Sequence, residues 1–260
     1  MSRKDTRNDF MDCPFDAVDM REAVDHALRW CKGDRRPRTV ITANAAILVM
    51  MQRDRELAEA CRSGDLIVPD GVPVVWASKI VGRPLRERVA GVDLMAHLLA
   101  AASAHGLRVF FLGGKEEVVT RLVELCKERY EGLVVAGHRN GYFGTDAHPE
   151  VIEQIRESKA DLLFVGMPTP FKEVWCQRYR DELGVPVIMG VGGSFDVLAG
   201  FIRRAPPWMQ NVGLEWLWRL SMEPRKMWRR YLVTNTLFIA RTLQETVRRR
   251  ALTSEDSTVH

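Results

Sequence analysis

Short apolar or β-branched runs alternate with longer amphipathic segments through the first 200 residues, and this alternation strongly constrains the fold. Each short run has the length of a strand and is bounded by Gly, Pro, Asp or Asn. We expect strands at Thr39–Thr42, Leu66–Val68, Arg108–Leu112, Leu133–Ala136, Leu162–Val165 and Pro186–Met189. The helical periodicity between them predicts helices at about Asn44–Cys61, Val72–Val81, Val92–His105, Glu116–Tyr130, Pro149–Ser158 and Phe171–Leu183.

This order of elements predicts an α/β protein. A helix between two strands returns the chain to the same end of the sheet, so the strands run parallel and helices cover both faces. We therefore expect a Rossmann-like, mainly parallel sheet within residues 13–203. In such sheets ligands bind at the carboxyl ends of the strands, and loops that follow strands are the first place to look for a site.

The chain changes character after residue 203. Residues 201–250 carry 11 Lys/Arg against three Asp/Glu, whereas residues 1–200 carry 27 against 29, and four of the seven tryptophans lie in the same stretch. We expect a basic, Trp-rich helical appendage at 204–250, a disordered N-terminus at 1–12 and a frayed end at 251–260. Positive charge mixed with large amphipathic rings is typical of a surface that meets an anionic bilayer.

Two apolar stripes run along this appendage. The first predicts one helix, and the second predicts another that begins at Pro224 beside several arginines. Their members are Trp208, Val212, Trp216 and Leu220 in the first stripe, and Trp228, Leu232, Ile239, Leu243 and Val247 in the second. Either stripe could pack on the core instead, and for the second helix the basic flank favours the interface.

Several classes of protein are disfavoured. The first dozen residues are charged and have no apolar stretch typical of a signal peptide, and no run approaches the ~20 apolar residues of a membrane span. The five cysteines are odd in number, scattered and never in a CxxC pair, and the histidines lack metal spacing. We therefore expect a cytoplasmic protein, peripheral on the inner membrane face, without disulfides or a zinc site.

Two glycine-bearing turns follow predicted strands. Leu112–Lys115 lacks the spacing of a phosphate-binding Walker loop, and in Gly190–Phe195 the phenylalanine replaces the last glycine of a dinucleotide-binding turn. Both turns nevertheless leave backbone N–H groups free of side chains at a helix start, which suits a phosphate or a sugar. The alternative is that these glycines only allow tight turns with positive φ.

Three polar side chains lie at or just after predicted strand ends, and three charged residues further along the chain are also candidates. Asp70 follows the second strand in a Pro-Asp-Gly turn and places a carboxylate at the edge where ligands bind. Thr42 and Asn44 end the first strand, where helix capping is the alternative role. Arg88 could be a solvated charge, and Lys172 with Glu173 a pair on a helix surface.

The order of these motifs resembles the WecG/TagA/CpsF family of bacterial glycosyltransferases over roughly residues 12–245. The resemblance rests on Thr42-Ala43-Asn44-Ala45, Pro69-Asp70-Gly71, Arg88-Val89-Ala90-Gly91-Val92-Asp93-Leu94, Phe111-Leu112-Gly113-Gly114-Lys115, Gly141-Tyr142-Phe143, Gly190-Val191-Gly192-Gly193-Ser194-Phe195-Asp196, Arg204-Ala205-Pro206-Pro207-Trp208-Met209-Gln210 and Gly213-Leu214-Glu215-Trp216-Leu217.

The resemblance implies an inverting transfer of a sugar, from a UDP-sugar to a polyprenyl-diphosphate-linked saccharide at the cytoplasmic membrane face. The products of such enzymes feed cell-surface polymers such as exopolysaccharide. It also implies that the appendage closes over the active site and helps to dock on the membrane. No cofactor and no bound metal are expected, and nucleic acid is not an expected partner.

The resemblance further implies roles for individual residues. Asp70 becomes the general base, because an acceptor hydroxyl must lose its proton as it attacks the anomeric carbon. Without a metal, cationic groups must stabilise the leaving diphosphate, and the matching appendage residues are Arg219, Lys226 and Arg229, with Arg225 as a neighbouring candidate. The predicted substrate pocket comprises Thr42, Asn44, Arg88, Lys172, Gly113, Gly114, Tyr142, Gly192, Gly193 and Asp196.

Lys172 departs from the family pattern, which has a glutamine at this position of the pocket. A cation in place of an amide should change which sugar is tolerated, and favours a donor with a carboxylate. Two other functions stay open: a nucleotide-sugar dehydrogenase or epimerase with a Rossmann fold, and a non-enzymatic protein that binds anionic surfaces. The sequence does not name the donor, the acceptor linkage or the pathway, and a homo-oligomer through the core stays open.

Overall fold

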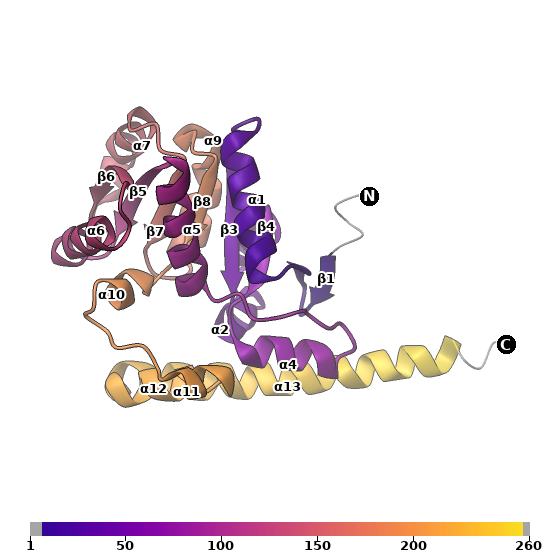
Figure 1. Cartoon of the computed structure of the whole chain (residues 1–260). Helices are drawn as coiled ribbons and strands as arrows, with labels where there is room; N and C mark the ends of the chain where they lie inside the picture. The colour runs from indigo at the N-terminus through magenta and orange to yellow at the C-terminus, as the bar shows by residue number, and fades with distance from the viewer. Residues whose placement is uncertain (1–6, 257–260) are drawn as a thin grey trace.

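The computed structural model describes residues 7–256, and within the last helix it does not describe the side chains at positions 226, 227, 230 and 250–256. In this part of the chain six parallel strands form one sheet in the order β4-β3-β8-β7-β5-β6 (Figure 1). The strands are β3 (Arg38–Ala43), β4 (Leu66–Pro69), β5 (Arg108–Gly113), β6 (Val134–Arg139), β7 (Leu162–Gly166) and β8 (Val187–Gly190). The six expected strands and the Rossmann-like fold are confirmed.

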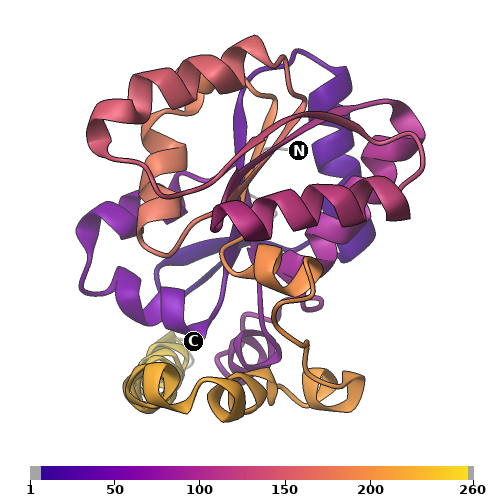
Figure 2. The same ribbon diagram turned by 90° about the vertical axis from the view of Figure 1, so that its left-hand side faces the viewer.

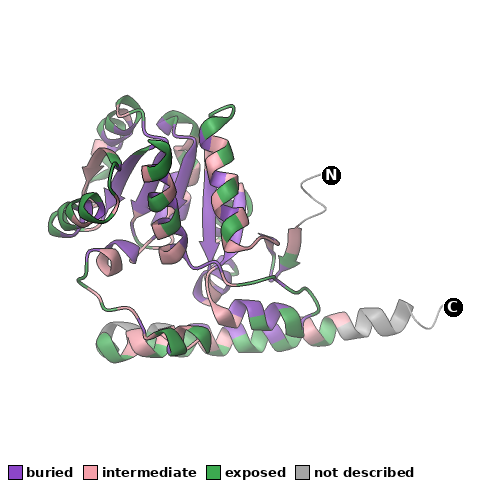
Figure 3. Cartoon of the chain, in the orientation of Figure 1, coloured by how far each residue is buried: buried purple, intermediate pink, exposed green. Residues whose placement is uncertain are grey.

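Helices cover both faces of this sheet (Figure 3). Along β5 the side chains alternate between two cores, with Val109 and Phe111 in one and Phe110 and Leu112 in the other. One face packs against α1 (Met20–Lys32), α5 (Gly91–His105), α6 (Glu116–Arg129) and α10 (Ser194–Leu198), and the other against α7 (His148–Glu157), α8 (Phe171–Arg178) and α9 (Arg180–Leu183). Burial on both faces explains the nearly continuous apolar strands.

Two of the expected helices are each divided in two. The segment expected at Asn44–Cys61 forms α2 (Ala45–Met51) and α3 (Arg55–Arg62), because the Asp54 side chain accepts the Leu57 N–H and starts a new helix. The segment expected at Phe171–Leu183 divides at Tyr179 into α8 and α9. The helix expected at Val72–Val81 is present as α4 (Val72–Ile80).

The N-terminus is more ordered than expected. Strand β1 (Arg7–Phe10) pairs antiparallel with β2 (Cys13–Asp16), so residues 7–12 of the segment predicted to be disordered form a strand and a turn. The Arg7 guanidinium lies 3.0 Å from the Asp16 carboxylate, which also accepts the Ile67 N–H. This pairing and the complete burial of Phe10 stabilise a segment whose composition alone suggested disorder. Residues 1–6 lie outside the described part.

The first appendage helix was predicted wrongly. The stripe from Trp208 to Leu220 is divided between α11 (Pro207–Asn211) and α12 (Glu215–Met222), which meet at Gly213. Gly213 has φ of 68°, and a Cβ there would lie 3.2 Å from Pro73 Cδ. The chain therefore turns at a glycine packed on α4, a tertiary contact that a helical periodicity cannot reveal.

The second appendage helix, α13 (Pro224–Asp256), begins at Pro224 as expected and lies along α2 and α4. It buries Thr234, Phe238 and Thr242, and Phe238 meets Phe10 edge to face at 6.4 Å. The helix continues to Asp256, and residues 257–260 lie outside the described part. The frayed end expected at 251–260 stays a prediction.

The predicted apolar stripe of α13 points away from the core. Trp228, Leu232, Ile239, Leu243 and Val247 are 55–68% exposed, so the alternative that this stripe packs on the core is wrong. In Figure 2 the orange α11 and α12 and the yellow α13 lie beneath the sheet, with α4 above them. No helix in residues 7–256 combines the length and apolar character needed to cross a bilayer.

Candidate active site

The strands point toward the appendage, so their carboxyl ends and the appendage enclose one region (Figure 1). Strands β4, β3 and β8 are neighbours there and bring together Asp70, Thr42 and the turn after Gly190. The Asp70 N–H donates to the Ala43 carbonyl, and the Asp70 carboxylate accepts the N–H of Gly91 at the start of α5. A Cβ on Gly91 would lie 3.1 Å from Thr42 Oγ1, so three of these loops meet tightly around the aspartate.

Asp70 has the electrostatics of a base that works near neutral pH. Burial, followed by the negative charge of Glu215, raises the pKa of the Asp70 carboxyl to about 6, while Arg88, the Gly91 N–H and Lys172 act in the opposite direction. A carboxyl with a pKa close to the working pH is both a competent proton acceptor and partly ionised.

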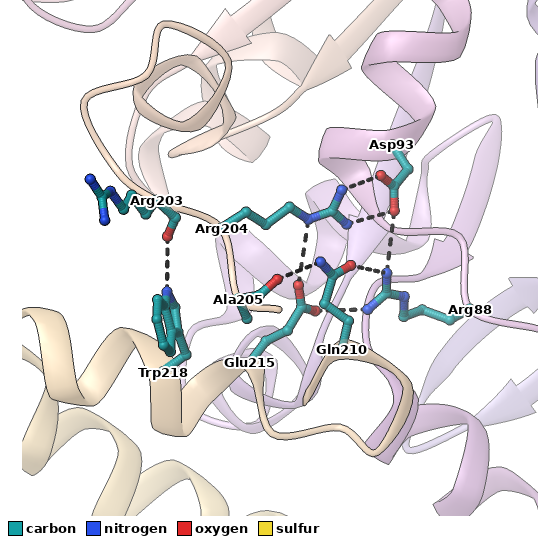
Figure 4. A network of polar contacts seen from close by, with 8 residues as sticks. All are labelled: Arg88, Asp93, Arg203, Arg204, Ala205, Gln210, Glu215 and Trp218. Carbon is teal, nitrogen blue, oxygen red and sulfur yellow. Dashed lines mark hydrogen bonds and ion pairs between the residues drawn. The ribbon is translucent and has the colours of Figure 1, made fainter. Parts of the chain in front are cut away.

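Arg88 joins the core to the appendage (Figure 4). Its guanidinium donates to the Glu215 carboxylate at 2.8 Å, to Asp93 at 3.2 Å and to Gln210 at 3.4 Å. Its side chain is only 16% exposed, so the alternative of a solvated surface charge is wrong.

A second arginine completes this network. Arg204 donates two hydrogen bonds to Asp93 at 2.5 and 2.7 Å, and its Nε lies 3.8 Å from the Glu215 carboxylate. Burial raises the pKa of Asp93, but the hydrogen bonds and charges of Arg204 and Arg88 outweigh burial and hold it below its ordinary value. Gln210 also donates to the Ala205 carbonyl at 2.7 Å, which ties α11 to the same loop.

Sequence reasoning assigned no role to Asp93, Arg204, Gln210 or Glu215. All four nevertheless lie inside motifs that carried the family resemblance. The three charged residues form ion pairs with Arg88 or with one another, and the neutral Gln210 accepts a hydrogen bond from Arg88. The sequence did contain a signal for this network, because the separate motifs carry opposite charges. Only the fold shows which of these charges form pairs.

Arg219 of α12 reaches the glycine turn that follows β8. A Cβ on Gly193 would lie 2.9 Å from the Arg219 guanidinium, and Gly192 has φ of 52°. The fold thus brings together a predicted diphosphate residue and two predicted pocket glycines. Because the two glycines have no side chains, the Arg219 guanidinium can approach the backbone closely. The guanidinium and the backbone N–H groups together concentrate positive charge, which suits a phosphate group.

Lys172 lies beneath the same turn. A Cβ on Gly190 would lie 3.2 Å from Lys172 Cδ, and the ammonium group forms an ion pair with Glu173, which also accepts from Thr169 at 3.0 Å. Lys172 and Glu173 are buried, so the expectation of a pair on a helix surface is wrong. The charge of Lys172 is compensated within the chain, which weakens the case for a donor with a carboxylate.

Other predicted pocket residues lie further from Asp70. Gly113 ends β5 and Gly114 follows it, four strand spacings or roughly 19 Å along the edge from β4. A Cβ on Gly113 would lie 2.5 Å from the Gly166 backbone, so close strand packing accounts for this glycine. Tyr142 is 75% exposed beyond β6.

The remaining predicted residues are less closely placed around Asp70. Asn44 caps α2 by accepting the Ile47 N–H, which is its alternative role, and Asp196 lies in α10 after the glycine turn. Arg225 and Arg229 are exposed near the start of α13, and the side chain of Lys226 lies outside the described residues. Their roles at a diphosphate stay predictions.

The amino-acid sequence matches the model of a known protein family. Residues 8–252 match the family described as "Glycosyl transferase WecG/TagA/CpsF family". The chain belongs to the WecG/TagA/CpsF family of glycosyltransferases. It is an enzyme of this class, so the dehydrogenase or epimerase and the non-enzymatic alternatives are not supported.

Two similar WecG/TagA/CpsF proteins come from Bacillus. The chain is 37% identical over 193 residues to a Bacillus spizizenii protein and 34% identical over 193 residues to one from Bacillus subtilis strain 168. In both cases the match covers 74% of each chain. Both relatives bear the name N-acetylglucosaminyldiphosphoundecaprenol N-acetyl-beta-D-mannosaminyltransferase.

Proposed function

We propose that this glycosyltransferase moves a sugar from a UDP-sugar to a saccharide carried on polyprenyl diphosphate, with inversion at the anomeric carbon, at the cytoplasmic membrane face. The observation that carries the proposal is the placement of Asp70 and of the glycine turn that Arg219 contacts at the same sheet edge, after β4 and β8 on either side of β3, in a chain of this family. The names of the two relatives support the lipid-linked acceptor, and cell-surface polymer synthesis is the process in which such a product is used.

The proposed chemistry is a single displacement. The acceptor hydroxyl oxygen attacks the anomeric carbon, its proton passes to the Asp70 carboxylate, and the bond from that carbon to the diphosphate oxygen breaks. UDP leaves with both electrons of this bond and gains negative charge. Arg219 and the backbone N–H groups of Gly192 and Gly193 would stabilise that charge, and the short approach of the Arg219 guanidinium to Gly193 supports this assignment.

A product assay tests the proposal. The full-length protein is incubated with single UDP-sugars, including UDP-N-acetylmannosamine, and a short-chain lipid diphosphate that carries N-acetylglucosamine. We expect one donor to give a product heavier by one sugar residue, together with UDP, and to do so equally with EDTA present. Oxidation or epimerisation of the nucleotide sugar without transfer would contradict the proposal. Residues 7–256 hold no group of three His, Cys, Asp or Glu side chains suited to a metal, yet metal independence stays a prediction until the EDTA measurement.

The pH dependence of transfer should report the ionisation of Asp70. A base must be deprotonated to accept a proton, and the pKa of this carboxyl is raised to about 6. We therefore expect kcat/KM to rise with pH through an apparent pKa near 6 and to level off above it. An acidic limb near 4, the ordinary range of an aspartate, would contradict the assignment.

We also propose that α13 docks on an anionic bilayer. Its exposed apolar stripe lies beside the exposed arginines Arg225, Arg229, Arg241 and Arg248, and an apolar band with a basic flank is the pattern of an interfacial helix. The neighbouring α4 adds two exposed apolar side chains, Trp76 and Ile80. The acceptor proposed above would itself lie in the membrane, which favours lipid as the partner of this surface.

Negatively charged residues in the stripe should weaken this docking. Leu232 and Leu243 are exposed in the protein and would become buried in the bilayer, a gain of about 1.5–3 kcal/mol for each side chain. We therefore expect Leu232→Glu combined with Leu243→Glu to weaken binding to phosphatidylglycerol vesicles at least tenfold. Co-sedimentation with the vesicles measures the affinity.

A matched control separates burial from charge. Gln244→Glu adds one negative charge at an exposed polar position beside the stripe and should lose far less affinity than Leu243→Glu alone. Equal losses in these two single variants would show that charge alone binds the bilayer. A dimer that the leucine variant alone disrupts, seen by sedimentation, would instead assign the stripe to a second copy of the chain.

A further inference from the structure

Glu215 occupies an unusual place for an acidic residue of a basic appendage. It is one of three acidic residues among residues 201–250, and it lies at the start of α12, facing the core rather than the solvent-exposed stripe. Its two carboxylate oxygens face two arginines: one oxygen accepts from Arg88 at 2.8 Å and the other lies 3.8 Å from Arg204 (Figure 4).

The same carboxylate is tied to the surroundings of Asp70. The Val89 N–H donates to the Pro69 carbonyl at 2.9 Å, so Arg88, from which Glu215 accepts a hydrogen bond, lies beside the Pro-Asp-Gly turn. After burial, the negative charge of Glu215 is the strongest influence that raises the pKa of Asp70. The groups that face Asp70 come from several elements: Arg88 from the loop before α5, the Gly91 N–H from α5 itself, Lys172 from α8, Arg204 from the loop before α11, and Glu215 from α12. Among these groups Glu215 is the negatively charged one, and the others are cations or a backbone N–H.

Glu215 orients Arg88 and places a negative charge near Asp70, and both effects depend on the position of α12. Because Arg88 is held by Asp93 and by Glu215, its guanidinium has a fixed direction at the edge of the site. Because Glu215 belongs to α12, both this direction and the negative charge near Asp70 depend on where the appendage sits. An undocked α12 would leave Arg88 with Asp93 as its ion-pair partner and Gln210 as a hydrogen-bond acceptor, and would leave Asp70 facing cations, as a weaker base.

We propose that Glu215 is a positioning residue, through which the docked appendage orients Arg88 and places a negative charge beside Asp70, so that the base reaches its working environment only when α12 is in place. This inference rests on the proposed function of Asp70 as the base. It assigns to the appendage a tuning role in addition to the cationic role of Arg219.

The test replaces Glu215 by glutamine, which keeps the shape and an acceptor oxygen for Arg88 but removes the charge. Carboxyl ¹³C NMR of aspartate-labelled protein, with the Asp70 signal assigned by its loss in Asp70→Asn, gives the titration midpoint directly. We expect Glu215→Gln to lower that midpoint by at least about half a pH unit, since loss of a nearby negative charge favours ionisation. The acidic limb of kcat/KM should move to lower pH by the same amount, with a lower plateau in kcat.

Two further variants make the result specific. Glu215→Asp keeps the charge and should leave the midpoint closer to the wild-type value than glutamine does. Glu223→Gln removes the same charge at the end of α12 and should leave the midpoint unchanged. An Asp70 midpoint that is equal in wild type and Glu215→Gln, in protein with an unchanged melting temperature, would overturn the proposal.

The two readouts also separate this inference from the proposed function. The NMR titration needs no substrate. If Glu215→Gln shifts the Asp70 midpoint but the wild-type protein transfers no sugar, the proposed function is wrong and the coupling of Glu215 to Asp70 stands. If the wild-type protein transfers sugar but Glu215→Gln shifts neither the midpoint nor the acidic limb, the proposed function stands and the coupling is wrong.

Discussion

Asp70→Asn is expected to lower kcat for sugar transfer about a thousandfold, within the range that a positioned general base contributes. The amide has nearly the same shape as the carboxylate but cannot accept the proton of the acceptor hydroxyl, so KM should change much less than kcat. Initial rates with the donor and the short-chain lipid acceptor measure both constants. Transfer at an undiminished rate with the correct donor would remove Asp70 from its proposed role.

Stability provides the control for this variant. The pKa of Asp70 is raised in the folded protein, so the folded state holds this proton more tightly than the unfolded chain does, and the stabilisation fades as pH rises through about 6. Above that pH the ionised carboxylate disfavours folding, and asparagine removes this cost. We expect the melting temperature of Asp70→Asn at pH 8 to equal or exceed that of the wild type, which would separate lost catalysis from lost structure.

Arg219→Ala is expected to lower kcat about a hundredfold, the usual scale for removal of one group that stabilises developing charge. The guanidinium lies against Gly193 at the glycine turn, and truncation would leave the departing diphosphate with backbone N–H groups alone. Arg219→Lys should retain part of the activity, because it keeps the charge but loses the planar fork of donors. Steady-state kinetics with a water-soluble acceptor measure the effect without a membrane step.

A second arginine of the appendage is the matched control. Arg248→Ala removes the same charge from an exposed position near the far end of α13, and with the water-soluble acceptor it should leave kcat within about twofold, since exposed charges at that distance are screened. If both variants lost activity equally, the net charge of the appendage rather than the placement of Arg219 would be responsible.

Much of the core and part of the site could be predicted from the sequence. Buried parallel strands are short, apolar and bounded by turn residues, so their places were visible in composition alone. Parallel strands also end at a common edge, which made Thr42, Asp70 and the Gly190–Phe195 turn neighbours once the sheet order was known.

The features that were not predicted depend on contacts between residues that are far apart in the sequence. Gly213 breaks the first appendage stripe because it packs on Pro73, and the β1–β2 hairpin is ordered through Asp16 and Ile67. The pairing of Arg88 with Glu215 joins residues 127 positions apart. Local propensity carries no information about such partners, and the motifs showed only that the charges were present.

The edge-to-face contact of Phe10 with Phe238 has a consequence for biosynthesis. The N-terminal hairpin and α13 are joined again where the Met11 N–H donates to Glu245, 234 positions later. The hairpin precedes the core in the chain and α13 follows it, so Phe10 lacks its contact with Phe238 until the ribosome has synthesised α13. The appendage can therefore settle on the hairpin only after the residues up to Glu245 have left the ribosome.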